Sequence, residues 1–413
     1  MTVEVNPIED QVTPSVRGAD RKRILVCLGT YLPGYKCGGP IRSVANRIAH
    51  LSPYLDFYVV TADRDTGDNE SYPGVKPNHW YRVGDARVLY GSSIGAKILR
   101  RAFREVQPDV IVLNSFWDTF TRAAVLLRRF GVFGDTPLLL APRGTFSPGA
   151  LEIKQAKKLL YLHVTKVLGL YKNVLWQTTA PSEKQELLQA APVRRLDPDS
   201  IYVAYEITDA IASPSHHTAK QQGAVKLAYI SRISEKKNLH FLFDVLMDIR
   251  GDVQLNLFGP LAESDLPYWA KCRARIAQLP KNISVEYQGG IEHSMVPQVL
   301  HDHHFFVLPT RGENFCHAAV ESFVNGTPVV LSDQTPWTNL SQAHAGFDIP
   351  LTDREAWVTA LQRCVDMDQQ IYESYLTGVK EFSRKFSVEE AVRQHLAMFQ
   401  SVLGLHFEAE GRP

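Results

Sequence analysis

The stretch FFVLPTRGENFCHAAVESFVNGTPVVL, residues 305–331, holds a strand, a loop, a helix and a second strand in succession. Residues 305–308 are a continuous apolar run, which is typical of a strand buried on both faces of a sheet. The loop 309–316 leads into a helix that Gly326 should end, and a second apolar run follows at 328–331. A strand, a helix and a strand in this order predict a parallel βαβ unit.

The same alternation occurs on both sides of this stretch. In the first half, apolar strands alternate with amphipathic helices, and after a polar interruption the alternation starts again. We therefore expect an α/β protein with two Rossmann-like, doubly wound domains that face each other across a cleft. The predicted strands are 24–28, 57–61, 110–113, 138–141, 226–230, 253–258 and 283–287, and the predicted helices include 41–51, 94–106 and 119–130.

The composition shifts also predict where the parts begin and end. We expect a flexible tail at 1–20, a first domain at 21–205, a linker at 206–224 and a second domain at 225–385. The final helix, predicted within 386–404, begins with a Ser-x-x-Glu capping box and is expected to cross back to the first domain.

The composition is that of a globular protein. The chain has 413 residues, of which 45% are hydrophobic and 22% charged, and 45 Lys and Arg balance 44 Asp and Glu. There is no apolar run of the roughly 18–20 residues that a membrane-spanning helix requires, and no hydrophobic leader. The five cysteines lack any C-x-x-C spacing, which favours reduced thiols. These features predict a cytoplasmic location.

The near-zero net charge conceals an asymmetry. Residues 1–205 contain 27 Lys and Arg against 19 Asp and Glu, whereas the remaining residues contain 18 and 25. A basic first half indicates an anionic partner, although charges spread over solvated helix faces explain the count equally well.

Two carboxylates lie eight residues apart in the stretch 305–331. Glu313 lies in the loop and Glu321 about one turn into the helix, so the free amides of the helix N-terminus lie between them. Such a turn can hold a sugar diphosphate, with one carboxylate accepting sugar hydroxyls and the other accepting ribose hydroxyls. A helix-dipole acid beside a buried glutamate is the structural alternative.

Two other loops follow predicted strands. Arg232 and Lys237 come directly after the first strand of the second half, where they place positive charge at the carboxyl edge of the sheet. Gly38 and Gly39 lie in the loop after the first strand of the chain and let backbone amides approach a phosphate. A solvated loop and a simple tight turn are the respective alternatives, and neither the dinucleotide fingerprint nor the P-loop spacing is present.

Taken together, these motifs resemble the family-4 glycosyltransferases, which are retaining, nucleotide-sugar-dependent enzymes of the GT-B architecture. The resemblance extends over residues 23–403. Its carriers are Gly38-Gly39, Ala141-Pro142-Arg143-Gly144, Arg232 with Lys237, Phe258-Gly259-Pro260, Gly289-Gly290, the E-x7-E pair Glu313 and Glu321, and Asn325-Gly326-Thr327-Pro328.

The resemblance implies how the donor diphosphate is held. Arg232 and Lys237 would bind its oxygens and act in catalysis. Gly38 and Gly39 would approach it from the first domain, and Gly290 would belong to the donor site.

The resemblance also assigns the two carboxylates. Glu313 would be catalytic and, with the amides of Asn314, Phe315 and Cys316, would bind the donor sugar, while Glu321 would hold the ribose. Many members carry a glycine at the position of Cys316, so a cysteine there would narrow the sugar pocket.

Arg143 departs from the family pattern, because many members carry a histidine at this strand end. It is an acceptor-side candidate, and the missing imidazole leaves the catalytic base unassigned. Front-face attack, in which the leaving phosphate accepts the acceptor proton, does not require one.

The resulting expectation is a metal-independent, cofactor-free hexosyltransferase. It would move a sugar from a UDP- or GDP-sugar to a glycan or lipid-linked glycan in surface polysaccharide assembly, with no nucleic-acid partner. A GT-B-like nucleotide-sugar epimerase and a non-catalytic sugar-nucleotide-binding protein are the rival interpretations, and an NAD-dependent oxidoreductase ranks last.

The sequence contains three weaker signals of a possible site or contact surface. Asp63 and Asp65 form the D-x-D triplet that best fits a metal site, and the histidines around residue 303 fit a structural role. The basic stretch 154–172 alternates with apolar residues and indicates peripheral contact with an anionic membrane, with an ordinary packed helix as the alternative.

Overall fold

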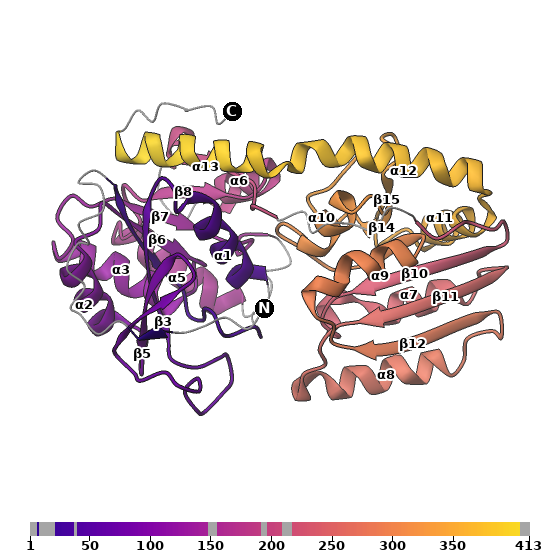
Figure 1. Cartoon of the computed structure of the whole chain (residues 1–413), viewed down its shortest axis with the longest axis horizontal. Helices are drawn as coiled ribbons and strands as arrows, with labels where there is room; N and C mark the ends of the chain where they lie inside the picture. Colours follow the sequence, from indigo (N-terminus) through magenta and orange to yellow (C-terminus); the bar gives the residue numbers. More distant parts are fainter. Residues whose placement is uncertain are drawn as a thin grey trace. The chain divides into compact units, whose positions relative to one another are not determined.

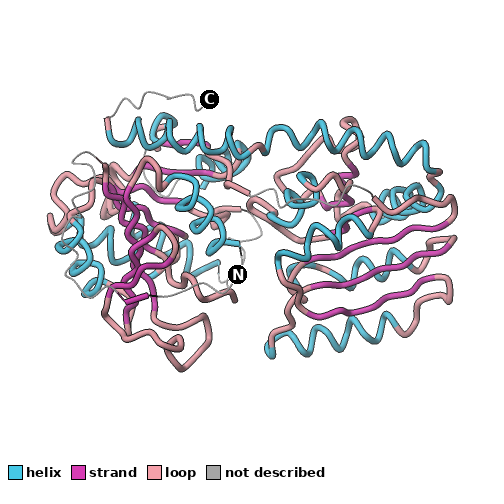
Figure 2. The backbone as a smooth tube through the Cα atoms, in the orientation of Figure 1, coloured by secondary structure: helices cyan, strands magenta, loops and turns pink. Residues whose placement is uncertain are grey.

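The computed structural model describes residues 6–7, 21–36, 39–147, 155–190, 196–208 and 217–404. The chain divides into two compact units: unit 1 contains Met1–Ile207 and Glu389–Pro413, and unit 2 contains Thr208–Val388. Each unit has its own sheet and helices, as Figure 1 and Figure 2 show. This is the two-domain α/β architecture that the alternation of strands and helices predicts.

Unit 1 is built on one mostly parallel sheet. Its nine described strands lie in the order β1-β4-β5-β3-β2-β6-β7-β8-β9, and pairing is parallel from β5 to β9. The strands are β1 (Asn6–Pro7), β2 (Arg23–Cys27), β3 (Asp56–Ala62), β4 (Trp80–Val83), β5 (Ala86–Gly91), β6 (Val110–Asn114), β7 (Leu138–Ala141), β8 (Leu175–Thr178) and β9 (Ile201–Val203).

Helices cover both faces of this sheet. One face packs against α2 (Ala96–Val106), α3 (Thr119–Arg129), α5 (Gln155–Val167) and α6 (Pro181–Ala190). The other face packs against α1 (Gly39–Leu51) and the last helix, α13 (Val388–Leu403). The strands are apolar on both sides because both sides are covered.

Helix α13 completes the core of unit 1. Met398 and Phe399 are buried with the residues of α1 and β2 in one hydrophobic cluster. In addition, Gln394 Oε1 accepts from the backbone N–H of Tyr205 at 3.0 Å, and His395 Nε2 lies 3.0 Å from the carbonyl oxygen of Tyr205. The last helix therefore belongs to the first unit, although unit 2 separates them in the sequence.

Several parts of unit 1 differ from the sequence expectation, which did not include strands β8 and β9. Within the expected tail 1–20, Asn6 and Pro7 pair with β4 as a short antiparallel strand, and the other tail residues lie outside the described part. The antiparallel pair β4 and β5 was not predicted.

The expected linker 206–224 is packed at both described ends. Glu206 and Ile207 are buried in unit 1. In unit 2, the Lys220 ammonium donates to the carbonyl oxygens of Val365 at 3.0 Å and Met367 at 2.9 Å. Only the part between 208 and 217 falls outside the described residues.

Unit 2 is a fully parallel, six-stranded sheet over its described residues, in the order β12-β11-β10-β13-β14-β15. The strands are β10 (Ala224–Ile230), β11 (Asp252–Phe258), β12 (Ile283–Gly289), β13 (Phe305–Leu308), β14 (Val329–Ser332) and β15 (Gly346–Ile349). The helices are α7 (Leu239–Leu246), α8 (Leu266–Ile276), α9 (Val296–Asp302), α10 (His317–Val324), α11 (Arg354–Asp366) and α12 (Gln369–Ser383).

The strand order of unit 2 reverses between β10 and β13. In open parallel sheets, ligands bind outside the carboxyl ends of the strands at such a reversal. The loops that follow these two strands are 231–238 and 309–316. They contain the cations and the first carboxylate singled out in the sequence.

No helix among the described residues combines the length and the hydropathy needed to cross a bilayer.

Candidate functional site

The carboxyl edge of the unit 2 sheet is held together by backbone hydrogen bonds between its loops. Arg311 N–H donates to the Lys236 carbonyl at 2.8 Å, which joins the loops after β13 and β10. Ser231 N–H donates to the Phe258 carbonyl at 2.9 Å, and Gly259 N–H donates to the Gly289 carbonyl at 2.7 Å. The loops are therefore one connected scaffold.

Lys237 and Glu313 form the central ion pair of this edge. The Lys237 ammonium lies 2.5 Å from Glu313 Oε1, and each side chain is only 14% exposed. Thr310 Oγ1 donates to the same carboxylate oxygen at 2.8 Å. Burial raises the pKa of Glu313, but the charge and hydrogen bond of Lys237, aided by Lys236 and Thr310, outweigh it and leave the pKa below its usual range. Glu313 is therefore an anion that can accept hydroxyl hydrogen bonds.

Glu321 is bound to a residue that the sequence analysis overlooked. His293 Nε2 lies 2.9 Å from Glu321 Oε1. His293 stands in the loop after β12, four residues beyond Gly289 and two strands away from β10. Its position just after a strand end is the signal that could have identified it.

Arg232 is exposed at the same edge, and Gly259 fixes its backbone. Gly259 has φ of 146°, and a Cβ placed there would lie 1.9 Å from the Ser231 carbonyl oxygen. Only glycine allows this approach of the loop after β11 to the loop after β10. The motif Phe258-Gly259-Pro260 thus has a packing reason.

Cys316 lies among the charged groups of the edge. The electrostatic neighbours of its thiol are Glu313, Lys237 and Glu321, and burial is the main cause that raises its pKa. The thiol is therefore protonated and neutral. Cys316 adopts φ of 61° and precedes α10, which begins without a side-chain cap.

The residues next to Cys316 present different groups. The Phe315 ring is buried against Trp337, with ring centroids 5.3 Å apart, so its backbone is the part that can serve a ligand. Asn314 is half-buried, and Gly290 is exposed with open space around its Cα. Arg232, Lys237, Glu313, Cys316 and Glu321 are thus brought to one edge of unit 2, with Gly290 in the loop after β12.

In unit 1, the glycine loop is only partly described. Gly38 lies outside the described residues, and Gly39 is the first residue of α1. Asp65 Oδ2 accepts from the backbone N–H groups of Tyr35 at 2.8 Å and Lys36 at 3.1 Å, which fixes the loop just before the glycines. Asp65 therefore works as a loop anchor.

The other carboxylate of this D-x-D triplet is also engaged. Asp63 is buried, and it accepts from Arg64 Nε at 2.8 Å and from Ser71 Oγ at 2.8 Å. Within the part of the chain that the structure places, no group of three or more His, Cys, Asp or Glu is arranged as a metal site.

Arg143 lies at the carboxyl edge of the unit 1 sheet, directly after β7. Its guanidinium pairs with Glu206 and donates to Asn114 Oδ1 at 2.9 Å, and burial lowers its pKa. Glu206 also faces Arg47 Nη2 at 3.9 Å. Arg143 is therefore committed to a buried network, whose carboxylate the sequence analysis had placed in a linker.

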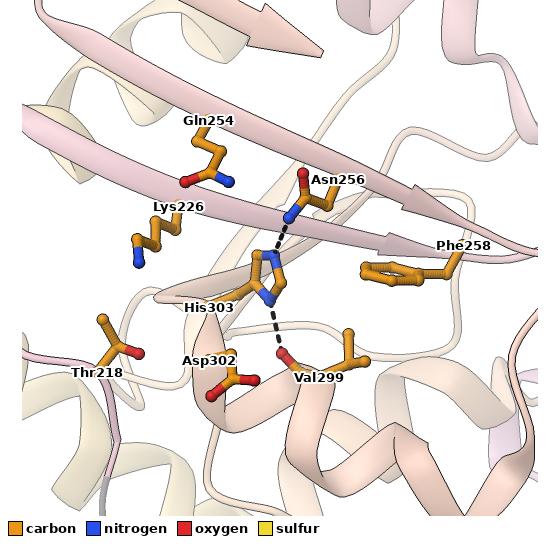
Figure 3. A pocket seen from close by; sticks show the side chains of 8 residues that line it. All are labelled: Thr218, Lys226, Gln254, Asn256, Phe258, Val299, Asp302 and His303. Atoms are coloured by element: carbon orange, nitrogen blue, oxygen red, sulfur yellow. Dashed lines mark hydrogen bonds between the residues drawn. The ribbon is translucent and has the colours of Figure 1, made fainter. Parts of the chain in front are cut away.

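A separate cavity of about 450 Å³ lies on unit 2, away from these residues. Figure 3 shows His303 at its wall, between the Asn256 amide at 3.0 Å and the Val299 carbonyl at 2.6 Å. Neighbouring His304 accepts the Lys226 N–H at Nδ1 at 2.9 Å. These two histidines form hydrogen bonds with strands β11 and β10, which is a structural role. None of the predicted donor residues lines the cavity.

Comparison with known proteins finds similarity to glycosyltransferases. Residues 201–374 match the family model "Glycosyl transferases group 1". Over 178 residues the chain is 23% identical to the lipopolysaccharide core biosynthesis mannosyltransferase LpsB of Rhizobium meliloti (strain 1021); the match covers 42% of this chain and 50% of that protein. The chain thus spans about half the length of this curated relative.

Solved structures are similar over almost the whole chain. HepE from Anabaena, in complex with UDP and glucose, has a TM-score of 0.66 at 16% identity and covers 92% of this chain and 100% of its own. Sucrose-phosphate synthase from Thermosynechococcus elongatus has a TM-score of 0.71 at 15% identity, and the match covers 93% of this chain and 100% of that one. The chain therefore has the GT-B fold, and its residues 201–374 are similar to the glycosyl transferases group 1 family.

Proposed function

We propose that this protein is a retaining, metal-independent hexosyltransferase of family 4. It moves a sugar from a UDP- or GDP-sugar to a glycan or lipid-linked glycan acceptor in surface polysaccharide biosynthesis. The observation that carries the proposal is the meeting of Arg232, Lys237, Glu313 and Glu321 at the carboxyl edge of unit 2, inside the segment that matches the family.

The two cations serve the leaving group. Cleavage of the anomeric bond builds negative charge on the diphosphate, and fixed donors aimed at developing charge contribute about 10²–10³ each in rate. Arg232 offers a planar fork for two phosphate oxygens, and Lys237 offers a point charge. Lys237 already pairs with Glu313, so a bound diphosphate would share its ammonium with that carboxylate.

The carboxylates of Glu313 and Glu321 accept hydrogen bonds from hydroxyl groups of the donor. Glu313, kept ionised by Lys237, accepts hydrogen bonds from the donor sugar, and the amides of Asn314, Phe315 and Cys316 complete that pocket. Glu321, positioned by His293, accepts the ribose hydroxyls. The neutral Cys316 thiol adds bulk to the sugar pocket without adding charge.

The transfer proceeds on one face of the sugar ring. The bond from the anomeric carbon to the phosphate oxygen breaks, the acceptor oxygen bonds to the same face of that carbon, and the acceptor proton passes to the departing phosphate. This route keeps the anomeric configuration and needs no protein base.

Unit 1 supplies the acceptor side. We assign Gly38 and Gly39 to the donor diphosphate, and Asp65 holds the backbone of Tyr35 and Lys36 just before them. Arg143 positions the acceptor pocket through Glu206 and Asn114, since its guanidinium is already bonded to both.

The relatives support the substrate class. One is named for mannosyl transfer in lipopolysaccharide core biosynthesis, another is described in complex with UDP-glucose, and a third is named a lipopolysaccharide outer core galactosyltransferase. These names support a nucleotide-sugar donor and a cell-surface glycan acceptor.

The test is a product assay with the purified chain and a panel of UDP- and GDP-sugars. Transfer to an acceptor with retained configuration, insensitive to chelator, supports the proposal. Conversion of the donor sugar without acceptor would identify an epimerase, and binding with neither transfer nor hydrolysis would identify a binding protein. Loss of transfer on adding chelator would overturn the metal-independent mechanism.

A further inference from the structure

Helix α5 of unit 1 exposes apolar side chains along its outer surface. Leu160 is 65% exposed and Val167 is 57% exposed, and Leu159, Val164 and Leu168 are also exposed. Leu160, Val164 and Val167 have the i, i+4, i+7 spacing that places them on one stripe of a helix. A surface helix normally presents polar residues there, so this helix has an apolar outer stripe.

The segment just before helix α3 contacts α5, and α3 has exposed apolar residues of its own. The Trp117 and Tyr161 rings are 5.4 Å apart, and the Lys158 ammonium lies 5.6 Å from the Trp117 ring centroid. Both helices pack on the same face of the sheet. At the far end of α3, Phe130 is 80% exposed and Leu126 is also exposed.

The charge of this surface is predominantly positive. Residues 119–130 and 155–172 contain no Asp or Glu. The cations of these two segments are Arg122, Arg128, Arg129, Lys157, Lys158, Lys166 and Lys172. The neighbouring helix α2 adds Lys97, Arg100, Arg101 and Arg104, against one acid, Glu105.

We propose that this surface, formed by α3 and α5 with α2 at its side, docks on an anionic lipid bilayer. Apolar side chains among many cations and few acids match an interface where acyl chains lie beneath negative headgroups. An acidic protein surface would pair with the cations but would not by itself take up the apolar stripe. The inference goes beyond sugar transfer and does not depend on it.

The test is flotation of the full-length protein with vesicles. One set contains equal parts of phosphatidylcholine and phosphatidylglycerol, and the other contains phosphatidylcholine alone. We expect binding to the first set, reduced by added salt because the attraction is screened, and much weaker binding to the second.

Two variants probe the two components of the surface. The triple change Leu160→Ser, Val164→Ser and Val167→Ser removes the apolar stripe, and Lys157→Glu with Lys166→Glu inverts the charge. Each should lower vesicle binding by about tenfold or more. The charge variant retains the apolar stripe, so it tests the proposal even if the triple variant folds poorly.

Matched controls lie on unit 2. Met247, Leu266 and Ile371 are exposed apolar side chains there, and their combined change to Ser should leave binding at the wild-type level. Lys271→Glu with Lys281→Glu serves as the control for charge.

Three outcomes would overturn the proposal. The first is wild-type protein that stays off the anionic vesicles, and the second is a unit 2 control that loses as much binding as the α5 variants. The third is a wild-type dimer that the triple variant converts to a monomer while neither protein floats, which would assign the surface to a second copy of this chain.

Discussion

Removing the charge of Lys237 while keeping its length, as in Lys237→Met, should destabilise unit 2 because it strands a nearly buried carboxylate. The Lys237 ammonium and Glu313 Oε1 are 2.5 Å apart. At an effective dielectric of about 20, two charges at that distance attract by about 6–7 kcal/mol, most of which offsets the loss of hydration of both groups.

The magnitude follows from the burial of the pair. Breaking a fully buried ion pair costs about 3–5 kcal/mol. Because each partner is 14% exposed, we expect the lower end, about 3 kcal/mol. Glu313→Gln should cost less, since an amide still accepts hydrogen bonds. The double variant Lys237→Met, Glu313→Gln carries no stranded charge and should be more stable than Lys237→Met alone.

Amide hydrogen exchange read peptide by peptide is the assay, since it separates unit 2 from unit 1 in a chain with two units. A loss of about 3 kcal/mol lowers protection of the most protected unit 2 peptides by about 100-fold or more. Unit 1 peptides are the internal control, and Lys271→Met, at an exposed lysine of unit 2, is the matched variant.

The pH dependence gives a second reading of the same pair. In the wild type the pKa of Glu313 is lowered, so its contribution to stability is complete above its unfolded pKa of about 4.3 and is lost as the pH falls through the folded pKa. In Lys237→Met the main opposition to burial is lost, while Lys236 and Thr310 remain, so the pKa of Glu313 is higher than in the wild type. Acidification towards pH about 4.3 should then relieve part of the destabilisation.

The reasoning is refuted if the loss in the double variant equals the sum of the two single losses. Additivity would mean that the two side chains do not interact in solution. A Lys237→Met variant whose unit 2 exchange matches the wild type at every pH would have the same meaning.

The remaining predictions concern the proposed donor site. Arg232→Ala should lower turnover by about two orders of magnitude with the fold intact. The control Arg273→Ala, on the surface of α8, should turn over at the wild-type rate. Equal rates for the wild type and both variants would contradict the role of Arg232. Glu321→Ala should weaken the binding of free nucleotide in calorimetry, whereas Glu313→Ala should spare it and impair turnover; the opposite pattern would exchange the two assignments. Gly259→Ala should lower the melting temperature and displace the Arg232 loop, because its Cβ would meet the Ser231 carbonyl at 1.9 Å; an unchanged melting temperature would contradict this.

Most of the parallel strands could be predicted from the sequence, although β5, β8, β9 and β15 were not. Runs such as 305–308 are apolar because the strands are covered on both faces, so these strands can be recognised from the sequence alone. The cations and carboxylates could be placed together because the carboxyl ends of parallel strands share one edge.

What could not be predicted depends on contacts between distant residues. The pairing of Arg143 with Glu206 joins positions 63 residues apart, and the pairing of Glu321 with His293 joins helix α10 to the segment after β12. The β4 and β5 hairpin has short strands with mixed burial, so neither a long apolar run nor a strict alternation marks it. Such features are decided by the packing of the whole unit.

Helix α13 has a consequence for synthesis. Because the core of unit 1 includes Met398 and Phe399, a ribosome must translate the entire intervening unit before the first unit can close. Unit 2, a continuous segment from Thr208 to Val388, is free of this delay. The nascent chain should therefore mature out of sequence order, with the strands of unit 1 exposed to chaperones and proteases until the helix that follows unit 2 has been made.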